Sequence, residues 1–304
     1  MNKKFYSNGK LLITGEYVVL DGASALALPT TFGQSLQIES GSEKKIIWKS
    51  YDSDGSLWYE DNLTYQEVIA YQKENQQSSI KATLLQILNE AYKMNPSFMD
   101  ASDGYSVSTH LTFPRNWGLG TSSTLINNIA QWAQIDAYEL LKSSFGGSGY
   151  DIACAQNDTP ILYQLIDNKP LVEQKELSFS FSEHIYFVYL NQKQNSREAI
   201  KNYYEKQASI QPVITEINSL TQRLIHSQSI GEFTAILEEH EQIMSAVLET
   251  KTVKERLFPD FSRTLKSLGA WGGDFIMVIS TENPTKYFKE KGFETILTYS
   301  EMIK

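Results

Sequence analysis

A glycine-rich turn between a strand pattern and a helix pattern places the strongest constraint on how this chain folds. Residues 117–125 read WGLGTSSTL, with two glycines around a leucine and three hydroxyl residues after them. The alternating segment 104–113 predicts a half-buried strand before the turn, and apolar residues at every fourth position from Leu125 predict a helix that begins near Ser122. The order strand, loop, helix favours a mixed α and β architecture.

Two roles are open for this turn. A helix N-terminus exposes unpaired backbone N–H groups and a partial positive charge, so it attracts anions such as phosphate. The residues that would line a phosphate cradle are Gly118, Leu119, Gly120, Thr121, Ser122 and Ser123. The stretch is not a P-loop, because no lysine follows its last glycine, and it lacks the third glycine of a dinucleotide fingerprint. A turn that only caps the helix is the alternative.

The length and charge of the chain limit its domains and partners. With 304 residues, 41% of them hydrophobic, the chain can bury one large core or two medium ones. A soft boundary near residue 175 predicts domains over 1–175 and 176–304. The formal charge of −9 argues against nucleic acid or an anionic membrane as the main partner, because both require a basic surface.

Cysteine and histidine usage excludes other classes. The single cysteine, Cys154, permits neither an intrachain disulfide nor a cysteine-based metal site. The four histidines include no pair at the i, i+4 spacing of a helical metal site. The first 20 residues lack the apolar centre of a signal peptide, and no run of 18 apolar residues predicts a membrane span. We expect a cytoplasmic protein.

Periodicity and turn residues predict the remaining elements. Strands are expected over 9–15, 24–30, 34–40, 44–51, 56–61, 159–165, 177–190, 274–280 and 294–300. Helices are expected over 80–94, where Ser78 or Ser79 would be the cap, and over 196–207, 214–227, 231–251, the region before Leu268 and 284–292.

Three stretches together resemble the signature motifs of the GHMP kinases. The first family motif, P-G-K-x-x-x-x-G-E-[HY], is matched from Gly9 to Tyr17, with Asn8 where proline is usual. The second, P-x-x-x-G-L-G-S-S-A-A, is matched from Pro114 to Thr124. The third, a G-A-G-G-G type loop, is matched by GAWGGD at 269–274, with Trp271 in place of a glycine. Any one motif is weak evidence, but three in order are strong.

The resemblance implies a fold and cofactors. It implies an α+β chain with the two-domain GHMP kinase fold. The ATP-binding N-terminal domain would resemble ribosomal protein S5 domain 2, and the C-terminal domain would be ferredoxin-like. ATP and Mg²⁺ are the implied cofactors, a small molecule is the implied substrate, and a monomer or homodimer is expected.

By the same resemblance, Asp151 and Lys10 are the expected catalytic pair. The segment GGSGYDIACA supplies the family's S-G-x-D aspartate, which is taken as the base that accepts the proton of the acceptor hydroxyl. Lys10, from the first motif, would lie beside it, and a neighbouring ammonium favours the charged form of a carboxylate. An ion pair that only holds the fold is the alternative.

The implied metal site is incomplete. The turn at 118–123 would hold the triphosphate, and Ser122 matches the hydroxyl that reaches Mg²⁺. The family's mevalonate kinases add a glutamate on an extra helix, but only 26 residues separate Thr124 from Asp151. Glu139 is the one acidic candidate near the right place, in poor register. The alternative is that DAYELL begins a plain surface helix.

The acceptor side is expected to draw on several segments. The candidate residues are Glu16, Tyr17, Ser148, Arg197, Gly269, Gly272 and Gly273. Arg197 could bind a carboxylate or phosphate with two hydrogen bonds, or it could be a solvated residue at a helix N-terminus.

Short strings favour phosphomevalonate as the acceptor. GEY, DIACA and GAWGGDF are similar to the corresponding segments of phosphomevalonate kinases. Mevalonate kinase is the near alternative, and a decarboxylase similar to the diphosphomevalonate enzymes is another. A non-catalytic ligand sensor on the same fold is also open, although the presence of both Lys10 and Asp151 argues against it.

Overall fold

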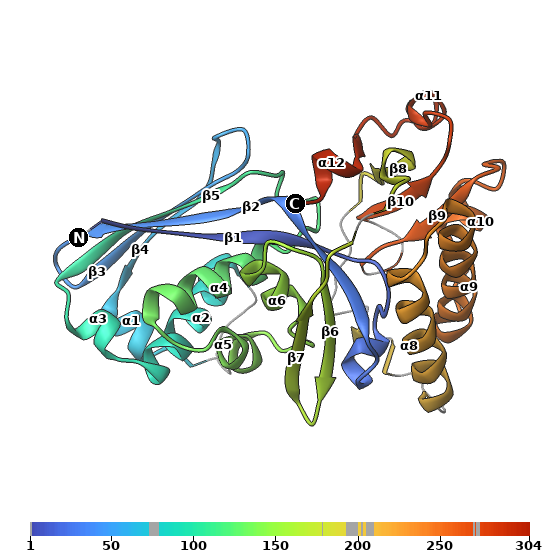
Figure 1. Cartoon of the computed structure of the whole chain (residues 1–304). Helices are drawn as coiled ribbons and strands as arrows, with labels where there is room; N and C mark the ends of the chain where they lie inside the picture. The colour runs from blue at the N-terminus through green and yellow to red at the C-terminus, as the bar shows by residue number, and fades with distance from the viewer. Residues whose placement is uncertain are drawn as a thin grey trace. The chain divides into compact units, whose positions relative to one another are not determined.

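The computed structural model describes residues 2–72, 79–177, 179–192, 200–201, 203–204, 210–269, 271 and 274–304. The chain forms two compact units that interleave along the sequence (Figure 1). Unit 1 comprises Met1–Gly9, Phe32–Arg115 and Leu119–Gln156, and unit 2 comprises Lys10–Thr31, Asn116–Gly118 and Asn157–Lys304. Strands β1 (Asn2–Leu12) and β2 (Ala25–Ser40) run through both units. The domain boundary near residue 175 stays a prediction.

Unit 1 is a sheet covered by helices. Its strands hydrogen-bond in the order β4, β3, β5 and β2, and β1 pairs with β2. β3 and β5 run parallel, whereas β4–β3 and β5–β2 are antiparallel pairs. Its elements beyond β1 and β2 are β3 (Lys45–Tyr51), β4 (Leu57–Thr64), α1 (Tyr65–Ile69), α2 (Ile80–Met94), α3 (Ser97–Asp100), β5 (Gly104–Leu111), α4 (Thr121–Ala133), α5 (Ala137–Ser144) and α6 (Tyr150–Gln156).

One apolar core joins this sheet to its helices. Trp48 of β3 and Val107 of β5 are register partners, and both are buried in one cluster with Leu88 of α2. Helix α2 begins where the Ser79 hydroxyl oxygen accepts a hydrogen bond from the Ala82 N–H at 3.0 Å. The predicted helix over 80–94 and its serine cap are therefore confirmed.

Unit 2 holds a second sheet and a hairpin. The sheet order is β11, β8, β10 and β9, with every pair antiparallel, and the β6–β7 hairpin pairs with the first residues of β2. Its further elements are the 3₁₀ turns η1 (Val18–Asp21) and η3 (Ser182–His184), β6 (Ile161–Ile166), β7 (Lys169–Gln174), β8 (Ile185–Tyr189), α8 (Gln211–Ile225), α9 (Ile230–Leu248), α10 (Val253–Leu257), β9 (Thr264–Ser267), β10 (Phe275–Ile279), α11 (Thr285–Glu290), β11 (Ile296–Thr298) and α12 (Tyr299–Met302).

Aromatic and aliphatic side chains fill the core of unit 2. Phe258, Ile276 and Phe288 belong to one buried cluster that links β10 to the short helices. Helix α9 packs against β9, and α8 runs beside α9 (Figure 1). Phe233 and Leu237 of α9 are fully buried, so this face of the helix packs into the core.

The α+β class is confirmed, and three local predictions are corrected. Residues 24–30 and 34–40 lie in one long strand, β2, rather than two. The region before Leu268 is not helical throughout, because α10 ends at Leu257 and β9 precedes Leu268. Among the described residues of 177–190, which exclude 178, the strand covers 185–189. The predicted helix over 196–207 lies mostly outside the described residues.

No helix in the described part of the chain combines the length and the apolar character that a bilayer crossing requires.

Candidate active site

The glycine-rich turn does not cap helix α4 through a side chain. The N-cap residue is Gly120, in a left-handed conformation with φ 95°, and among the described residues no side chain accepts a capping hydrogen bond there. Thr121, Ser122 and Ser123 form the first turn of the helix, and Ser122 is exposed. Helices α2 and α9 differ, since an N-cap serine accepts a backbone hydrogen bond in each. The helix therefore starts at a glycine N-cap without a hydroxyl cap, and the phosphate-binding role of the turn stays a prediction.

The first glycine of the turn lies against a carboxyl group of unit 2. A β-carbon added to Gly118 would lie 2.3–2.6 Å from the carboxyl carbon and oxygens of Asp274. Gly118 also has φ 71°, which side chains rarely adopt. Just before it, the Trp117 ring packs edge-on against Phe275, with ring centroids 5.4 Å apart. Close approach and backbone conformation thus both require glycine at 118.

The third motif is described in part. Gly269 has φ 61°, and a β-carbon there would lie 3.8 Å from an oxygen of Asp274. Trp271 is buried and has φ 54°, in the left-handed region that glycine adopts most readily. Gly272 and Gly273 lie outside the described residues.

Asp151 lies in unit 1 after a second glycine-rich loop. Gly146, Gly147 and Gly149 have φ values of 75°, 105° and 92°, and the loop leads directly into helix α6. Ser148, within this loop, is buried, whereas Asp151 is partly buried in the first turn of α6.

Lys10, the expected partner of Asp151, is partly buried on β1 in unit 2. Because the two residues belong to different units, their pairing stays a prediction. Arg197 lies outside the described residues.

The two residues predicted to bind Mg²⁺ are Glu139 and Ser122. Glu139 is exposed on α5, and its backbone N–H donates to the N-cap carboxylate of Asp136 at 3.1 Å. Within the described ranges, no three His, Cys, Asp or Glu side chains are grouped to hold a metal ion. The exposed hydroxyl of Ser122 is an oxygen ligand of the kind Mg²⁺ accepts when nucleotide oxygens complete the shell.

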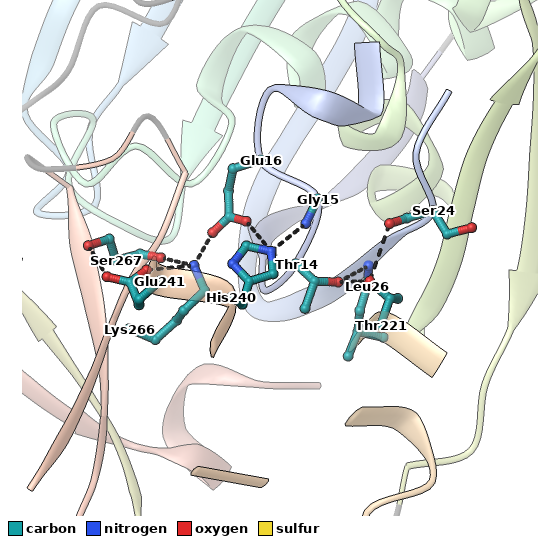
Figure 2. Close-up of polar contacts among 10 residues, drawn as sticks. All are labelled: Thr14, Gly15, Glu16, Ser24, Leu26, Thr221, His240, Glu241, Lys266 and Ser267. Carbon is teal, nitrogen blue, oxygen red and sulfur yellow. Dashed lines mark hydrogen bonds and ion pairs between the residues drawn. The ribbon is translucent and has the colours of Figure 1, made fainter. Parts of the chain in front are cut away.

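Glu16 and Tyr17 differ from each other in exposure. Tyr17 is partly exposed, and its ring packs against Tyr203 with centroids 5.5 Å apart. Glu16, in contrast, is 0% exposed. Its carboxylate faces Lys266 and His240, so it does not face an acceptor directly as predicted (Figure 2).

Lys266 of β9 is the centre of a buried polar cluster that the sequence did not suggest (Figure 2). Its ammonium group pairs with Glu16 and lies 3.1 Å from a carboxylate oxygen of Glu241. The other carboxylate oxygen of Glu241 accepts a hydrogen bond from the Ser267 hydroxyl at 2.9 Å. His240 Nε2 lies 3.3 Å from the second oxygen of Glu16. The only sequence signal was a lysine in the apolar run just before the third motif.

Burial dominates the electrostatics of this cluster. It raises the pKa of Glu16 to about 7, although the Lys266 ammonium acts in the opposite direction. Burial also raises the pKa of Glu241 and, with the Lys266 charge, holds the pKa of His240 well below its usual value. Burial alone would lower the pKa of Lys266, but the two carboxylates outweigh it and raise that pKa.

Tyr17 is affected by the same surroundings. Burial, followed by the charges of Glu16 and Asp274, raises the pKa of the Tyr17 hydroxyl, which therefore stays protonated at neutral pH. This connects Tyr17 electrostatically to the carboxyl group that lies against Gly118.

Comparisons with known sequences find no match. No protein-family model matches the chain. No curated protein matches it either.

Solved structures do match over nearly the whole chain. Methanococcus jannaschii mevalonate kinase shares 15% identity, covers 97% of this chain and 96% of its own, and has a TM-score of 0.69. Streptococcus pneumoniae phosphomevalonate kinase, in complex with phosphomevalonate and AMPPNP, shares 15% identity with coverages of 97% and 99% and a TM-score of 0.68. Lactococcus lactis galactokinase, complexed with galactose, shares 12% identity with coverages of 98% and 92% and a TM-score of 0.66.

Three kinases with different acceptors thus share one architecture with this chain. At these identities the likeness concerns the fold. The chain has the two-domain fold of the GHMP kinases, as its three motifs predicted.

Proposed function

We propose that this protein is an ATP-dependent kinase of a mevalonate-pathway metabolite, with phosphomevalonate as the acceptor. The observation that carries the proposal is the N-terminus of α4. Its N-cap, Gly120, supplies no capping side chain, and exposed Ser122 follows in the first turn. Such a terminus binds phosphate through free backbone N–H groups and the helix dipole. The fold shared with mevalonate kinase and phosphomevalonate kinase supports the same chemistry.

The nucleotide would bind with its phosphates at residues 118–123. Gly118, Leu119 and Gly120 bring backbone to the phosphates, and Thr121, Ser122 and Ser123 add hydroxyl groups. Mg²⁺ supplies charge neutralisation of the phosphates when bound, and Ser122 is the residue we propose to hold it. In phosphoryl transfer, a protein acts mainly by positioning the two substrates and neutralising the charge of the phosphates.

Asp151 and Lys10 would act at the acceptor oxygen. As this oxygen bonds to the γ-phosphorus, the bond from phosphorus to the leaving ADP oxygen breaks. Asp151 accepts the proton, if any, that the acceptor oxygen carries, and Lys10 adds a positive charge at this oxygen. A partly buried aspartate in the first turn of α6 is suited to this role.

The acceptor itself would contact segments from both halves of the sequence. Tyr17, Ser148 and the glycines of the third motif (269, 272 and 273) are the proposed contacts. Arg197 is the proposed partner for a carboxylate or phosphate of the acceptor, because a guanidinium forms paired hydrogen bonds with either group.

An acceptor panel tests the proposal. ATP turnover is measured with phosphomevalonate, mevalonate, homoserine and galactose, and CO₂ release is followed in parallel. We expect turnover with phosphomevalonate and no CO₂. The variant Asp151→Asn should lose about 10²-fold or more of the rate if the aspartate is the base. Asp136→Asn is the matched control, since it is exposed and asparagine caps a helix equally well.

The other outcomes are distinct. CO₂ release would indicate a decarboxylase, and ATP binding without turnover of any acceptor would indicate a sensor. Turnover of mevalonate alone would indicate that the protein is a mevalonate kinase. An Asp151→Asn variant as fast as Asp136→Asn would remove the proposed base.

A further inference from the structure

The backbone at Tyr17 is strained. Tyr17 has φ 62° and ψ −53°, and the Val18 N–H donates to the Glu16 carbonyl oxygen at 2.7 Å across it. This three-residue turn with positive φ is rare. A residue other than glycine held in such a conformation is strained, and the conformation persists only where its surroundings fix it.

Both residues before Tyr17 are tied to elements far away in the sequence (Figure 2). The Gly15 N–H donates to Nε2 of His240, on α9, at 3.1 Å. The Glu16 carboxylate pairs with Lys266 on β9. The strained turn is thus fixed on one side by the buried cluster of Glu16, His240, Glu241 and Lys266, which we call the turn lock.

The turn lock is not explained by stability alone. Each of its four side chains is at most 5% exposed. The desolvation of buried ions offsets much of their attraction, and apolar residues of similar volume often stabilise a fold as well or better. A cluster of this kind beside a strained turn points to a positioning role.

The contacts within the turn lock require a shared proton. His240 Nε2 faces both the Gly15 N–H and the second oxygen of Glu16. In the part of the chain that the structure describes, this Glu16 oxygen is buried and makes no hydrogen bond. Because Nε2 accepts the Gly15 N–H, it carries no proton of its own, so it repels the Glu16 oxygen 3.3 Å away unless the carboxyl group is protonated.

A charge count leads to the same result. With both carboxylates ionised, Glu16 and Glu241 outnumber the single Lys266 ammonium. One proton on Glu16 or on His240 makes the turn lock neutral, which a fully buried site favours. The Gly15 N–H donates to His240 Nε2, which places that proton on Glu16. The raised pKa of Glu16 and the lowered pKa of His240 agree with a neutral acid beside a neutral imidazole.

The groups that face Glu16 come from two elements. Lys266 lies on β9, and His240 and Glu241 lie on α9. Tyr17 follows Glu16 in the chain and stays protonated near neutrality.

We propose that Lys266, His240 and Glu241 are positioning residues that hold Glu16, and through it the strained turn that presents Tyr17 to the acceptor, with the firmest hold when Glu16 carries a proton. The inference rests on the proposed function for the identity of the ligand. The turn lock itself acts whether or not phosphomevalonate is the acceptor. Deprotonation leaves excess negative charge in a buried site and loosens the turn, so acceptor binding weakens as pH rises.

Two measurements on Glu16→Gln test this proposal, because glutamine imitates the protonated acid at every pH. Hydrogen exchange of the Val18 amide, corrected for its intrinsic rate, is compared at pH 6 and pH 8.5. We expect exchange in the wild-type protein to quicken about tenfold at the higher pH, and exchange in Glu16→Gln to stay constant. The acceptor KM should rise severalfold in the wild type alone, while kcat and the KM for ATP follow the same profile in both proteins.

Two further variants sharpen the test. Glu241→Gln removes a neighbouring negative charge that raises the pKa of Glu16. The pH at which exchange of the Val18 amide quickens should therefore be lower in this variant. Lys291→Met is the control, because its half-exposed ammonium pairs with Asp260 in unit 2, away from the turn lock. It should keep the wild-type profile.

Results that contradict the turn lock differ from results that contradict the proposed function. Equal protection of Val18 at both pH values in the wild type, or the wild-type pH dependence in Glu16→Gln, would overturn the turn lock. An unshifted transition in Glu241→Gln would do the same. A kinase assay without turnover of any acceptor would overturn the proposed function and the role of Tyr17, while the exchange data alone would still decide whether the cluster holds the turn.

Discussion

The carboxyl group of Asp274 fills the space that a β-carbon on Gly118 would need. The two residues belong to the second and third sequence motifs, and both lie in unit 2. The contact explains why packing alone requires a glycine at the first glycine position of the second motif.

Gly118→Ala should be more destabilising than an ordinary left-handed glycine substitution. Alanine at positive φ costs about 1–2 kcal/mol, and the clash with Asp274 should add about 1–3 kcal/mol as overpacking. Gly55→Ala is the matched control, since Gly55 has φ 80° and its β-carbon would meet nothing within 4 Å. Urea unfolding measures both variants.

Adding Asp274→Ala to the Gly118→Ala variant shows how much of the lost stability comes from the clash with the carboxyl group. Removing this carboxyl group should recover the overpacking part of the loss in Gly118→Ala, leaving only the backbone cost. If Gly118→Ala and Gly55→Ala lose equal stability, the contact has no energetic weight.

The sequence predicted the elements whose patterns are local. The helix over 80–94 and the helix after the glycine-rich turn have apolar residues on one face, and that face is buried. The strand at 104–113 alternates, and its structure follows the alternation. The need for glycine in the motifs could also be predicted from the sequence. Gly118 and Gly269 have the positive φ that only glycine adopts freely.

The turn lock could not be predicted, because its partners are distant in sequence. Nothing near Lys266 indicates that its ammonium meets Glu16, 250 residues away. In the run EEHEQ at 238–242, the first two glutamates are exposed, whereas His240 and Glu241 are buried. A polar run on a helix predicts that all its side chains are exposed to solvent. Only tertiary packing determines that the first two are exposed and the next two are buried.

Thr221→Val should destabilise the fold through a buried hydroxyl bridge (Figure 2). The Thr221 hydroxyl donates to the Thr14 hydroxyl oxygen at 2.8 Å, and that oxygen also accepts from the Leu26 N–H at 3.0 Å. Valine keeps the shape but removes the donor, so a loss of about 1 kcal/mol is expected. Thr215→Val, on the exposed side of the same helix, should change the free energy of unfolding by less than about 0.5 kcal/mol.

Thermal or urea unfolding of the two threonine variants decides the point. Equal losses would mean that the hydroxyl bridge between α8 and the segment at Thr14 contributes nothing measurable.

Ser122→Ala should weaken the use of MgATP and leave the acceptor unaffected. Ser122 is exposed in the first turn of α4, so its removal should not change Tm. Loss of one oxygen ligand should raise the KM for MgATP about tenfold, equivalent to about 1.4 kcal/mol. Steady-state kinetics with each substrate varied in turn measures this, with Ser143→Ala, at an exposed position of α5, as the control. A rise in acceptor KM instead would assign Ser122 to the other side of the reaction.

The stability of the protein should depend on pH through Glu16. Its pKa is about 7 in the folded protein against 4.5 for the ordinary group, so the native state binds a proton that the unfolded chain has lost. The stabilisation is complete below about pH 4.5, and it is lost as pH rises towards 7. The slope is at most about 1.4 kcal/mol per pH unit.

Neighbouring groups titrate in the same range, so the comparison with Glu16→Gln is essential. The raised pKa of Glu241 acts in the same direction as that of Glu16, whereas the lowered pKa of His240 favours the native state as pH rises towards 6.5. Lys266 titrates well above this window. Subtracting the variant's free energy of unfolding from that of the wild type removes these shared contributions. The difference should fall between pH 4.5 and 7 and be constant above, and a flat difference would mean that Glu16 is ionised throughout and holds the turn by charge alone.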